Sequence, residues 1–143
     1  MAALLLTGEY FPNIDQKGRM NFPSKLRDGL GERFYITRWM EPCLVVFSEE
    51  EWELICKKIK SQPFSLSGDA QRYLSTNACL VEPDKQGRVS IPQNLRERAG
   101  ITKEVAVIGV LDRAEIWDKE RWLTKSDEMN SELFSAKMLE LGI

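Results

Sequence analysis

The sequence contains no histidine, the side chain that enzymes use most often as a general base and that proteins use most often as a metal ligand. Cysteine is also scarce: Cys43, Cys56 and Cys79 are the three, and their spacing matches no paired-cysteine metal site. We therefore expect no metal site and no cofactor. We expect the cysteines to be small buried hydrophobic side chains in a reducing cytoplasm.

Long apolar runs are absent as well. No stretch of about 18 apolar residues occurs, so the sequence predicts no membrane span. The apolar segment Ala2–Leu6 is too short for a signal peptide, and Glu9 follows it closely. We expect this segment to be a short N-terminal extension or part of a first strand.

The two common glycine-rich phosphate-binding loops, G-x-x-x-x-G-K and G-x-G-x-x-G, do not occur. Carboxylates are abundant, but they lie in the first turns of predicted helices, where helix capping and solubility explain them. Without histidine, the usual catalytic triads are excluded too. We therefore expect neither enzymatic activity nor a small-molecule substrate.

What the chain does contain is an internal repeat, which decides the fold. The segment Asp15–Pro23 (DQKGRMNFP) recurs as Asp84–Pro92 (DKQGRVSIP). The correspondence continues beyond the motif through these pairs: Leu26 and Leu95, Arg27 and Arg96, Gly31 and Gly100, Phe47 and Trp117, and Trp52 and Trp122. Two copies are too few for a solenoid. They predict a duplicated module that folds as a pseudo-symmetric pair, or as half of a larger symmetric assembly.

Each copy of the motif predicts a tight turn followed by a strand. Asp15 and Asp84 open the turns, because an aspartate carboxylate accepts a hydrogen bond from a backbone N–H two residues further on. Gly18 and Gly87 fit the turn position that requires a positive φ. The next four residues of each copy alternate between polar and apolar, which is the pattern of a half-buried strand. A proline then ends the strand, and a short helix follows.

The remaining elements follow from periodicity and turn residues. The predicted strands are residues 4–14 (interrupted near Pro12), 34–39, 43–47, 78–82, 105–110 and 114–117. The predicted helices are residues 24–30, 93–99, one starting at Ser48 with an S-x-x-E capping box, 69–77 with Asp69 as its cap, one capped by Asp118, and 126–141. Residues 61–68 are expected to be an irregular link.

These elements give an α+β fold and a division into five segments. They are an N-terminal extension (1–8), a first domain with its trailing helix (9–60), a linker (61–77), a second domain (78–125) and a C-terminal helical tail (126–143). Each repeat is too small for an independent hydrophobic core, so we expect the two to share one.

The charge distribution is uneven. The formal net charge is −2, which by itself argues against a nucleic-acid-binding protein. Bases nevertheless gather at the motif: four bases and one acid lie between Asp15 and Arg27, and four bases and two acids between Asp84 and Arg98. The duplicated turn is thus a local basic site on an acidic protein. The alternative interpretation is an ordinary solvated face.

The residues of both repeats resemble one known family. The segments that carry the resemblance are Gly8-Glu9-Tyr10, Ile14-Asp15, Lys17-Gly18-Arg19, Pro23, Leu26-Arg27, Thr37-Arg38, Cys43-Leu44, Glu51-Trp52, Asp84-Lys85-Gln86-Gly87-Arg88, Lys103-Glu104-Val105 and Glu115-Ile116-Trp117-Asp118-Lys119. Nearly everything from Gly8 to Trp122 is similar to MraZ, a family of bacterial transcription regulators built from two SpoVT-AbrB (AbrB-like) swapped-hairpin half-domains. The paired D-x-x-G-R turns and the E-I-W-D-K segment make the resemblance specific.

The resemblance implies a fold and a partner. The two half-domains would form a double-psi, barrel-like β core with an additional C-terminal helix. Subunits would close into an octamer-like ring in the cytoplasm, associated with the nucleoid. The ring would bind short repeated double-stranded DNA sites near the promoter of the division and cell-wall gene cluster, usually repressing it.

The resemblance also implies roles for motif residues. Asp15, Gly18, Asp84 and Gly87 would brace the turns. Arg19 and Arg88 would be the main DNA contacts, helped by Lys17, Lys85, Arg27 and Arg96. The competing interpretation is that Arg19 and Arg88 merely pair with the neighbouring aspartates to rigidify the turns, and both roles can coexist. The alternative function is a ring-forming scaffold for protein interactions that does not read DNA sequence.

Overall fold

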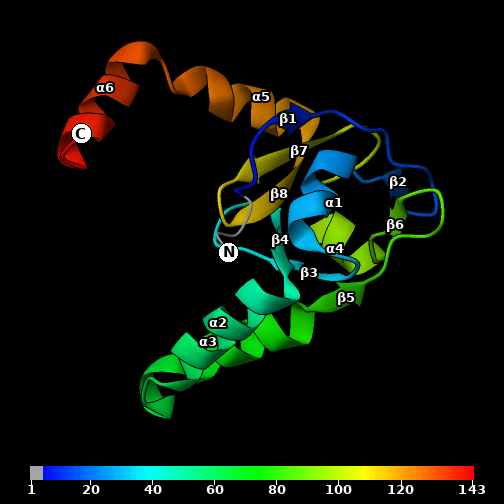
Figure 1. Cartoon of the computed structure of the whole chain (residues 1–143), viewed down its shortest axis with the longest axis horizontal. Coiled ribbons are helices and arrows are strands. Elements are labelled where there is room, and N and C mark those ends of the chain that lie inside the picture. The colour runs from blue at the N-terminus through cyan, green and yellow to red at the C-terminus, as the bar shows by residue number, and fades with distance from the viewer. Residues whose placement is uncertain (1–4) are drawn as a thin grey trace.

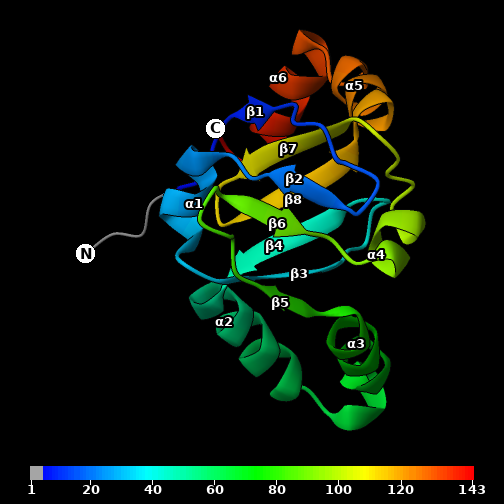
Figure 2. The same ribbon diagram turned by 90° about the vertical axis from the view of Figure 1, so that its right-hand side faces the viewer.

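The computed structural model describes residues 5–143 of the chain, and its centre is one antiparallel sheet of six strands in the order β1-β7-β8-β4-β3-β5 (Figure 2). The strands of this sheet are β1 (Glu9–Tyr10), β3 (Phe34–Arg38), β4 (Leu44–Ser48), β5 (Cys79–Val81), β7 (Val105–Val110) and β8 (Arg113–Asp118). A second ribbon of two strands, β2 (Arg19–Asn21) and β6 (Arg88–Ser90), lies over the large sheet in Figure 2.

The strand order of the large sheet is symmetric with respect to the two repeats. Strands β1, β3 and β4 of the first repeat correspond to β5, β7 and β8 of the second. The edge strand β1 pairs with β7, and β5 pairs with β3, so each repeat contributes an edge strand to the other repeat's hairpin. The two hairpins then meet through β4 and β8. This exchange confirms the swapped, pseudo-symmetric arrangement that the duplicated motif predicts.

Residues 5–143 form six helices. They are α1 (Ser24–Leu30), α2 (Glu49–Lys60), α3 (Phe64–Asn77), α4 (Gln93–Arg98), α5 (Lys119–Glu128) and α6 (Ser131–Glu140). Their caps follow the sequence in two predicted places: Ser48 Oγ accepts a hydrogen bond from the Glu51 N–H at 3.1 Å, and Asp118 Oδ2 accepts one from the Arg121 N–H at 3.2 Å.

The alternating motif residues form one shared core. Met20 and Phe22 of the first copy, and Val89 and Ile91 of the second, are all at most 3% exposed. They belong to the same buried cluster as residues of α1, α4 and the large sheet. An apolar interior shared between both repeats gives the expected α+β fold with a barrel-like β core, because neither repeat buries its own apolar face alone.

Each repeat ends in a helical arm, and the two arms differ (Figure 1). In the first repeat α2 and α3 pack side by side as a hairpin. In the second, α5 follows β8 but α6 extends away from the body. Trp52 of α2 lies 6.5 Å from Phe47 between ring centroids, and Trp122 of α5 lies 5.9 Å from Trp117. The repeated aromatic pairs therefore hold the first helix of each arm.

Two helix predictions are wrong in their extent. Helix α3 begins at Phe64, so much of the expected link 61–68 is helical and Asp69 lies inside the helix instead of capping it. Pro63 occupies the cap position, and Gly68 is accommodated because the Phe64 ring packs against it. The expected helix 126–141 is broken at Met129, and Asn130 starts α6 by accepting a hydrogen bond from the Leu133 N–H at 2.9 Å.

The expected first strand, residues 4–14, is shorter than predicted. Leu4 lies outside the described residues; within the rest, pairing is limited to β1 and to isolated bridges at Leu6, Asn13 and Ile14. Pro12 interrupts the ladder because it has no N–H to donate. Within residues 5–143, no helix combines the length and the apolar character needed to cross a membrane.

Candidate nucleic-acid interface

The first turn is organised by the carboxylate of Asp15. Its Oδ1 accepts hydrogen bonds from the backbone N–H groups of Lys17 and Arg19, both at 2.9 Å, and its Oδ2 accepts one from Arg19 Nε at 2.8 Å. Gly18 has a φ of 81° and donates its N–H to the Asp15 carbonyl at 3.0 Å. The backbone N–H of Arg19, followed by its side chain, lowers the pKa of Asp15 below the ordinary value of 3.8.

The second turn repeats this geometry. Asp84 Oδ1 accepts from the N–H groups of Gln86 and Arg88, both at 2.9 Å, and Oδ2 accepts from Arg88 Nε at 3.0 Å. Gly87 has the same φ of 81°. The backbone N–H of Arg88 is the main cause that lowers the pKa of Asp84. Lys and Gln exchange positions between the copies without effect, because both contribute only a backbone N–H here.

Each turn leaves an arginine oriented but only partly engaged. The ion pair uses Nε of Arg19 and of Arg88, and the side chains remain 39% and 38% exposed. Among the hydrogen bonds of residues 5–143, none uses a terminal guanidinium nitrogen (Nη1 or Nη2) of either arginine. These nitrogens are therefore available to an external acceptor. Bracing of the turn and presentation of the guanidinium occur together in the same side chain.

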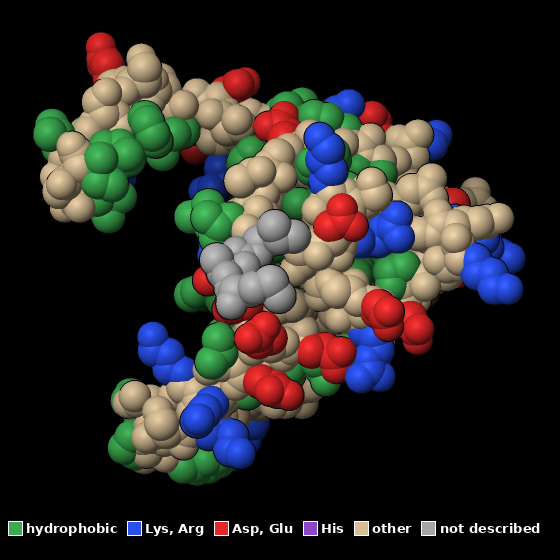
Figure 3. Space-filling view, viewed as in Figure 1, with side chains coloured by type: hydrophobic (Ala, Val, Ile, Leu, Met, Phe, Trp, Pro, Cys, Tyr) green, Lys and Arg blue, Asp and Glu red, His purple; other side chains and the backbone are tan. Residues whose placement is uncertain are grey.

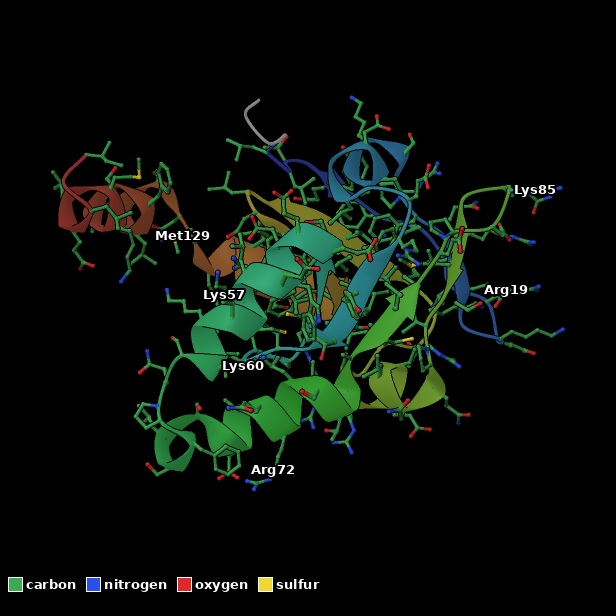
Figure 4. All side chains as sticks on the ribbon, turned by 60° about the horizontal axis from the view of Figure 1, so that its bottom comes forward. Arg19, Lys57, Lys60, Arg72, Lys85 and Met129 are labelled. Atoms are coloured by element: carbon green, nitrogen blue, oxygen red, sulfur yellow. The ribbon has the colours of Figure 1, made fainter. Side chains whose placement is uncertain are left out.

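The lysines of the motif point outward. Lys17 and Lys85 are exposed at the tips of the turns. Figure 4 shows Arg19 and Lys85 on the same edge of the molecule, pointing away from the body and far from the helical arms. The sequence placed these residues in one site, and the structure brings both turns to one side of the protein.

The two turns are joined by the β2–β6 ribbon. Arg19 pairs with Ser90, and Asn21 pairs with Arg88, in an antiparallel register. The ribbon continues at both ends: the Phe22 N–H donates to the Gly87 carbonyl at 3.0 Å, and the Ile91 N–H donates to the Gly18 carbonyl at 2.8 Å. The turns thus lie at opposite ends of one short, two-fold-related element.

Arg27 and Arg96, which the sequence grouped with the DNA contacts, lie further in. Arg27 of α1 lies against Gly87, and Arg96 of α4 lies against Gly18. Arg96 Nε donates to the Ile91 carbonyl at 3.0 Å. This contact between the repeats was not predicted from the sequence. The sequence does show that both the glycine and the arginine are duplicated at the same spacing, but only the fold shows which glycine contacts which arginine.

Charge segregates over the surface as the motif predicts (Figure 3). Lys and Arg side chains stand at the edge that carries the β2 and β6 turns, whereas Asp and Glu gather near the start of α2. A hollow there is lined by the acidic residues Asp28, Glu32, Glu49, Glu50, Glu51 and Asp112. Acidic side chains also reach the second turn, because Asp28, Glu32 and Glu82 line a hollow together with Arg27 and Asp84.

The described carboxylate and thiol groups form no cluster suited to a metal ion. Among the described residues, no three Cys, Asp or Glu side chains are grouped closely enough to hold a metal ion. Of the three thiols, Cys43 is buried and Cys56 and Cys79 are half-buried, and burial raises the pKa of each. These environments suit structural cysteines more than reactive ones.

The fold and the paired turns define a duplicated α+β protein whose two swapped half-domains share one core. A family model described as the MraZ protein, and as antitoxin-like, matches residues 5–73 and again residues 74–140. The chain belongs to the MraZ family. The double match coincides with the two repeats seen in the sheet order.

Full-length relatives support the same assignment. The protein named Transcriptional regulator MraZ from Acetivibrio thermocellus is 46% identical over 141 residues, covering 95% of this chain and 98% of that protein. Its namesake from Caldicellulosiruptor bescii is 46% identical over 144 residues, covering 97% and 100%. That of Clostridium botulinum (strain Eklund 17B) is 42% identical over 143 residues, covering 97% and 100%.

Proposed function

We propose that this protein is a transcriptional regulator that binds specific double-stranded DNA through its two Asp-braced turns. The observation that carries the proposal is the duplicated geometry of Arg19 and Arg88. Each is held at Nε by an aspartate, and no hydrogen bond within residues 5–143 engages its terminal nitrogens. The names of the relatives, which describe transcriptional regulators, support the same function.

The chemistry of the turns suits base reading and phosphate binding together. A guanidinium donates two parallel hydrogen bonds to O6 and N7 of guanine in the major groove, and an ammonium binds phosphate as a point charge. We assign the first role to Arg19 and Arg88 and the second to Lys17 and Lys85. Anchoring at Nε limits the rotamers of each arginine before DNA arrives, which reduces the entropy lost on binding.

We propose further that copies of the chain assemble head to tail into a ring. Helix α6 carries the apolar residues Leu133, Phe134 and Leu139, and Leu139 is 76% exposed. On the other arm, α2, α3 and β3 form an apolar groove of about 470 Å³ lined by Trp39, Ile55 and other apolar residues. An α6 helix of one copy that enters this groove of the next would bury both surfaces.

Charge complements this apolar match. Residues 126–143 contain four acids and one base, and residues 54–77 contain four bases and one acid. Figure 4 shows Lys57, Lys60 and Arg72 on the α2–α3 arm. Because the two surfaces differ, the contact is heterologous, and it closes into a ring if the rotation between copies permits.

A ring would multiply weak contacts. If repeated DNA sites match the spacing of neighbouring subunits, the effective concentration of the second site strengthens binding without any new contact. This would let an acidic chain bind DNA tightly. As the family resemblance implies, we place this regulator in the cytoplasm, on the nucleoid, acting as a repressor at short repeats near the promoter of the division and cell-wall gene cluster.

The deciding experiment is a fluorescence-anisotropy titration of the purified protein on the DNA upstream of its own coding sequence. A scrambled duplex of equal length is the control, and the salt is near physiological. Specific regulation predicts tight binding to the upstream duplex alone, with an affinity that falls linearly in log–log terms by about 0.9 per phosphate contacted. Equal, weak binding to both duplexes would contradict the proposal. It would favour the alternative, a ring that serves as a protein-interaction scaffold.

A further inference from the structure

The contact between Arg27 and Gly87 joins the two repeats. A Cβ atom placed on Gly87 would lie 2.9 Å from Nη2, 3.1 Å from Cζ and 3.3 Å from Nη1 of Arg27. Three guanidinium atoms at similar distances mean that the group lies against the glycine backbone. Arg27 belongs to the first repeat and Gly87 to the turn of the second.

The reciprocal contact exists between Arg96 and Gly18. A Cβ on Gly18 would lie 2.7 Å from Arg96 Nε, 2.9 Å from Arg96 Cζ and 2.6 Å from the Ile91 carbonyl oxygen. Here the second repeat supports the turn of the first. The two contacts are therefore related by the same pseudo-two-fold symmetry as the strands.

These glycines answer two separate requirements. A φ of 81° already favours glycine, although asparagine and aspartate also tolerate such values. A Cβ at Gly18 would also meet the Ile91 carbonyl oxygen at 2.6 Å, and a Cβ at Gly87 would force the Arg27 guanidinium to shift. The turn sequence is thus adapted to the arginine of the opposite repeat as well as to its own backbone.

The surroundings of Arg27 and Arg96 differ from those expected of a side chain that contacts DNA directly. Arg27 Nε is buried and has no hydrogen-bond partner within the described part of the chain, and Arg96 Nε is occupied by the Ile91 carbonyl at 3.0 Å. The side chains of Arg19 and Arg88, by contrast, are 39% and 38% exposed, and no hydrogen bond within residues 5–143 uses their terminal nitrogens. The four arginines of the motif therefore fall into two pairs with different surroundings.

We propose that Arg27 and Arg96 are positioning residues, each of which holds the DNA-binding turn of the other repeat. The two turns then move as one unit and present Arg19 and Arg88 at a fixed separation. This inference rests on the proposed DNA-binding function only for its effect on DNA binding. The brace, by which we mean the contacts of Arg27 with Gly87 and of Arg96 with Gly18, is a property of the free protein.

The planar guanidinium suits this role better than an ammonium would. A flat, delocalised cation lies against a peptide surface and tolerates partial desolvation, whereas the compact ammonium of lysine is strongly hydrated. We therefore expect Arg27→Lys to keep the charge but lose the brace.

The first test is amide hydrogen exchange of the free protein. Arg27→Ala should accelerate exchange at Gly87 and Arg88, in the opposite repeat, on the order of tenfold, and change Gly18 and Arg19 much less. Arg96→Ala should do the reverse. Lys25→Ala and Arg98→Ala, exposed neighbours on α1 and α4, are the matched controls and should change neither turn. Exchange that quickens only in the mutated repeat, or nowhere, would overturn the proposal.

The second test separates positioning from direct contact on the upstream duplex. Arg27→Ala should weaken binding without changing the salt slope, whereas Lys17→Ala should lower the slope by about 0.9. A slope lowered by that amount in Arg27→Ala, with normal turn exchange, would make Arg27 a phosphate contact and refute the brace. Where Arg27→Ala fails to fold, Arg27→Lys gives the same readouts. If no variant binds DNA, the exchange rates still show whether Arg27 and Arg96 hold the opposite turns. The proposed DNA-binding function and this inference can therefore fail independently.

Discussion

Met20 and Val89 face each other at the centre of the β2–β6 ribbon, and the chain is arranged around them with near two-fold symmetry. In the large sheet the corresponding central pair is Val45 and Glu115, where β4 meets β8. The two pairs mark where the repeats meet in each sheet. One chain thereby builds from its own halves what a symmetric dimer would build from two copies.

Removing the exposed arginines should abolish specific DNA binding before it affects the fold. A bidentate arginine–guanine pair discriminates by about 1–3 kcal/mol, so Arg19→Ala and Arg88→Ala should each weaken binding to the upstream duplex by roughly 10- to 100-fold. The measurement is anisotropy, with light scattering to confirm an unchanged molecular mass. Lys125→Ala on α5, whose side chain pairs with Glu41, is the control. Unaltered affinity in the double variant would show that these turns are not the contact.

The aspartates of the turns should contribute to stability only above acidic pH. Their pKa values are lowered in the folded protein by the N–H groups of Arg19 and Arg88. The folded state therefore binds fewer protons than the unfolded state at pH values near and below 3.8. This stabilisation is fully present above 3.8 and is lost as pH falls further, through the lower pKa of the folded state. Urea denaturation from pH 6 to pH 3 should show a stability gap between wild type and Asp15→Asn/Asp84→Asn that closes towards pH 3. A gap that is constant over this range would contradict the expectation.

Deleting the last helix should dissolve the assembly and leave the repeats folded. A chain ending at Glu128 retains every strand and α1–α5 but lacks α6 and its exposed Leu139. We expect monomer-sized particles by light scattering, with an unchanged near-ultraviolet spectrum from the core aromatic residues. The control is Lys137→Ala, which keeps the apolar residues of α6. An intact ring after truncation would rule out docking of α6.

Cys43 should resist thiol reagents until the protein unfolds. It is 3% exposed, and burial, with Glu115 and Glu41 nearby, raises the pKa of its thiol far above the normal range. Because the thiolate is the reactive form, labelling at pH 8 should proceed first at the half-buried Cys56 and Cys79. Mass spectrometry of timed samples identifies the labelled sites. Early modification of Cys43 would mean that this part of the sheet opens in the native state.

The motif could be predicted in detail because its contacts are local. The Asp15 carboxylate, the Gly18 φ and the strand alternation involve residues at most four apart, and local hydrogen bonding with backbone sterics fixes them. The helix boundaries near Pro63 and Met129 could not be predicted as well. Near Pro63, proline, glycine and serine indicated a loop, but packing of Phe64 over Gly68 decides the outcome. Near Met129 one continuous helix was expected, but Asn130 caps a new helix.

The sequence by itself determined that the chain is duplicated, that each copy holds an Asp-braced basic turn, and that histidine chemistry is excluded. Tertiary structure alone decided how the copies combine: β1 pairs in the second repeat's hairpin, β5 in the first, and Arg27 and Arg96 cross to the opposite turns. The physical reason is that repeats this small cannot bury their apolar faces alone. They close one core together, and which residues meet across it depends on long-range packing that no local pattern encodes.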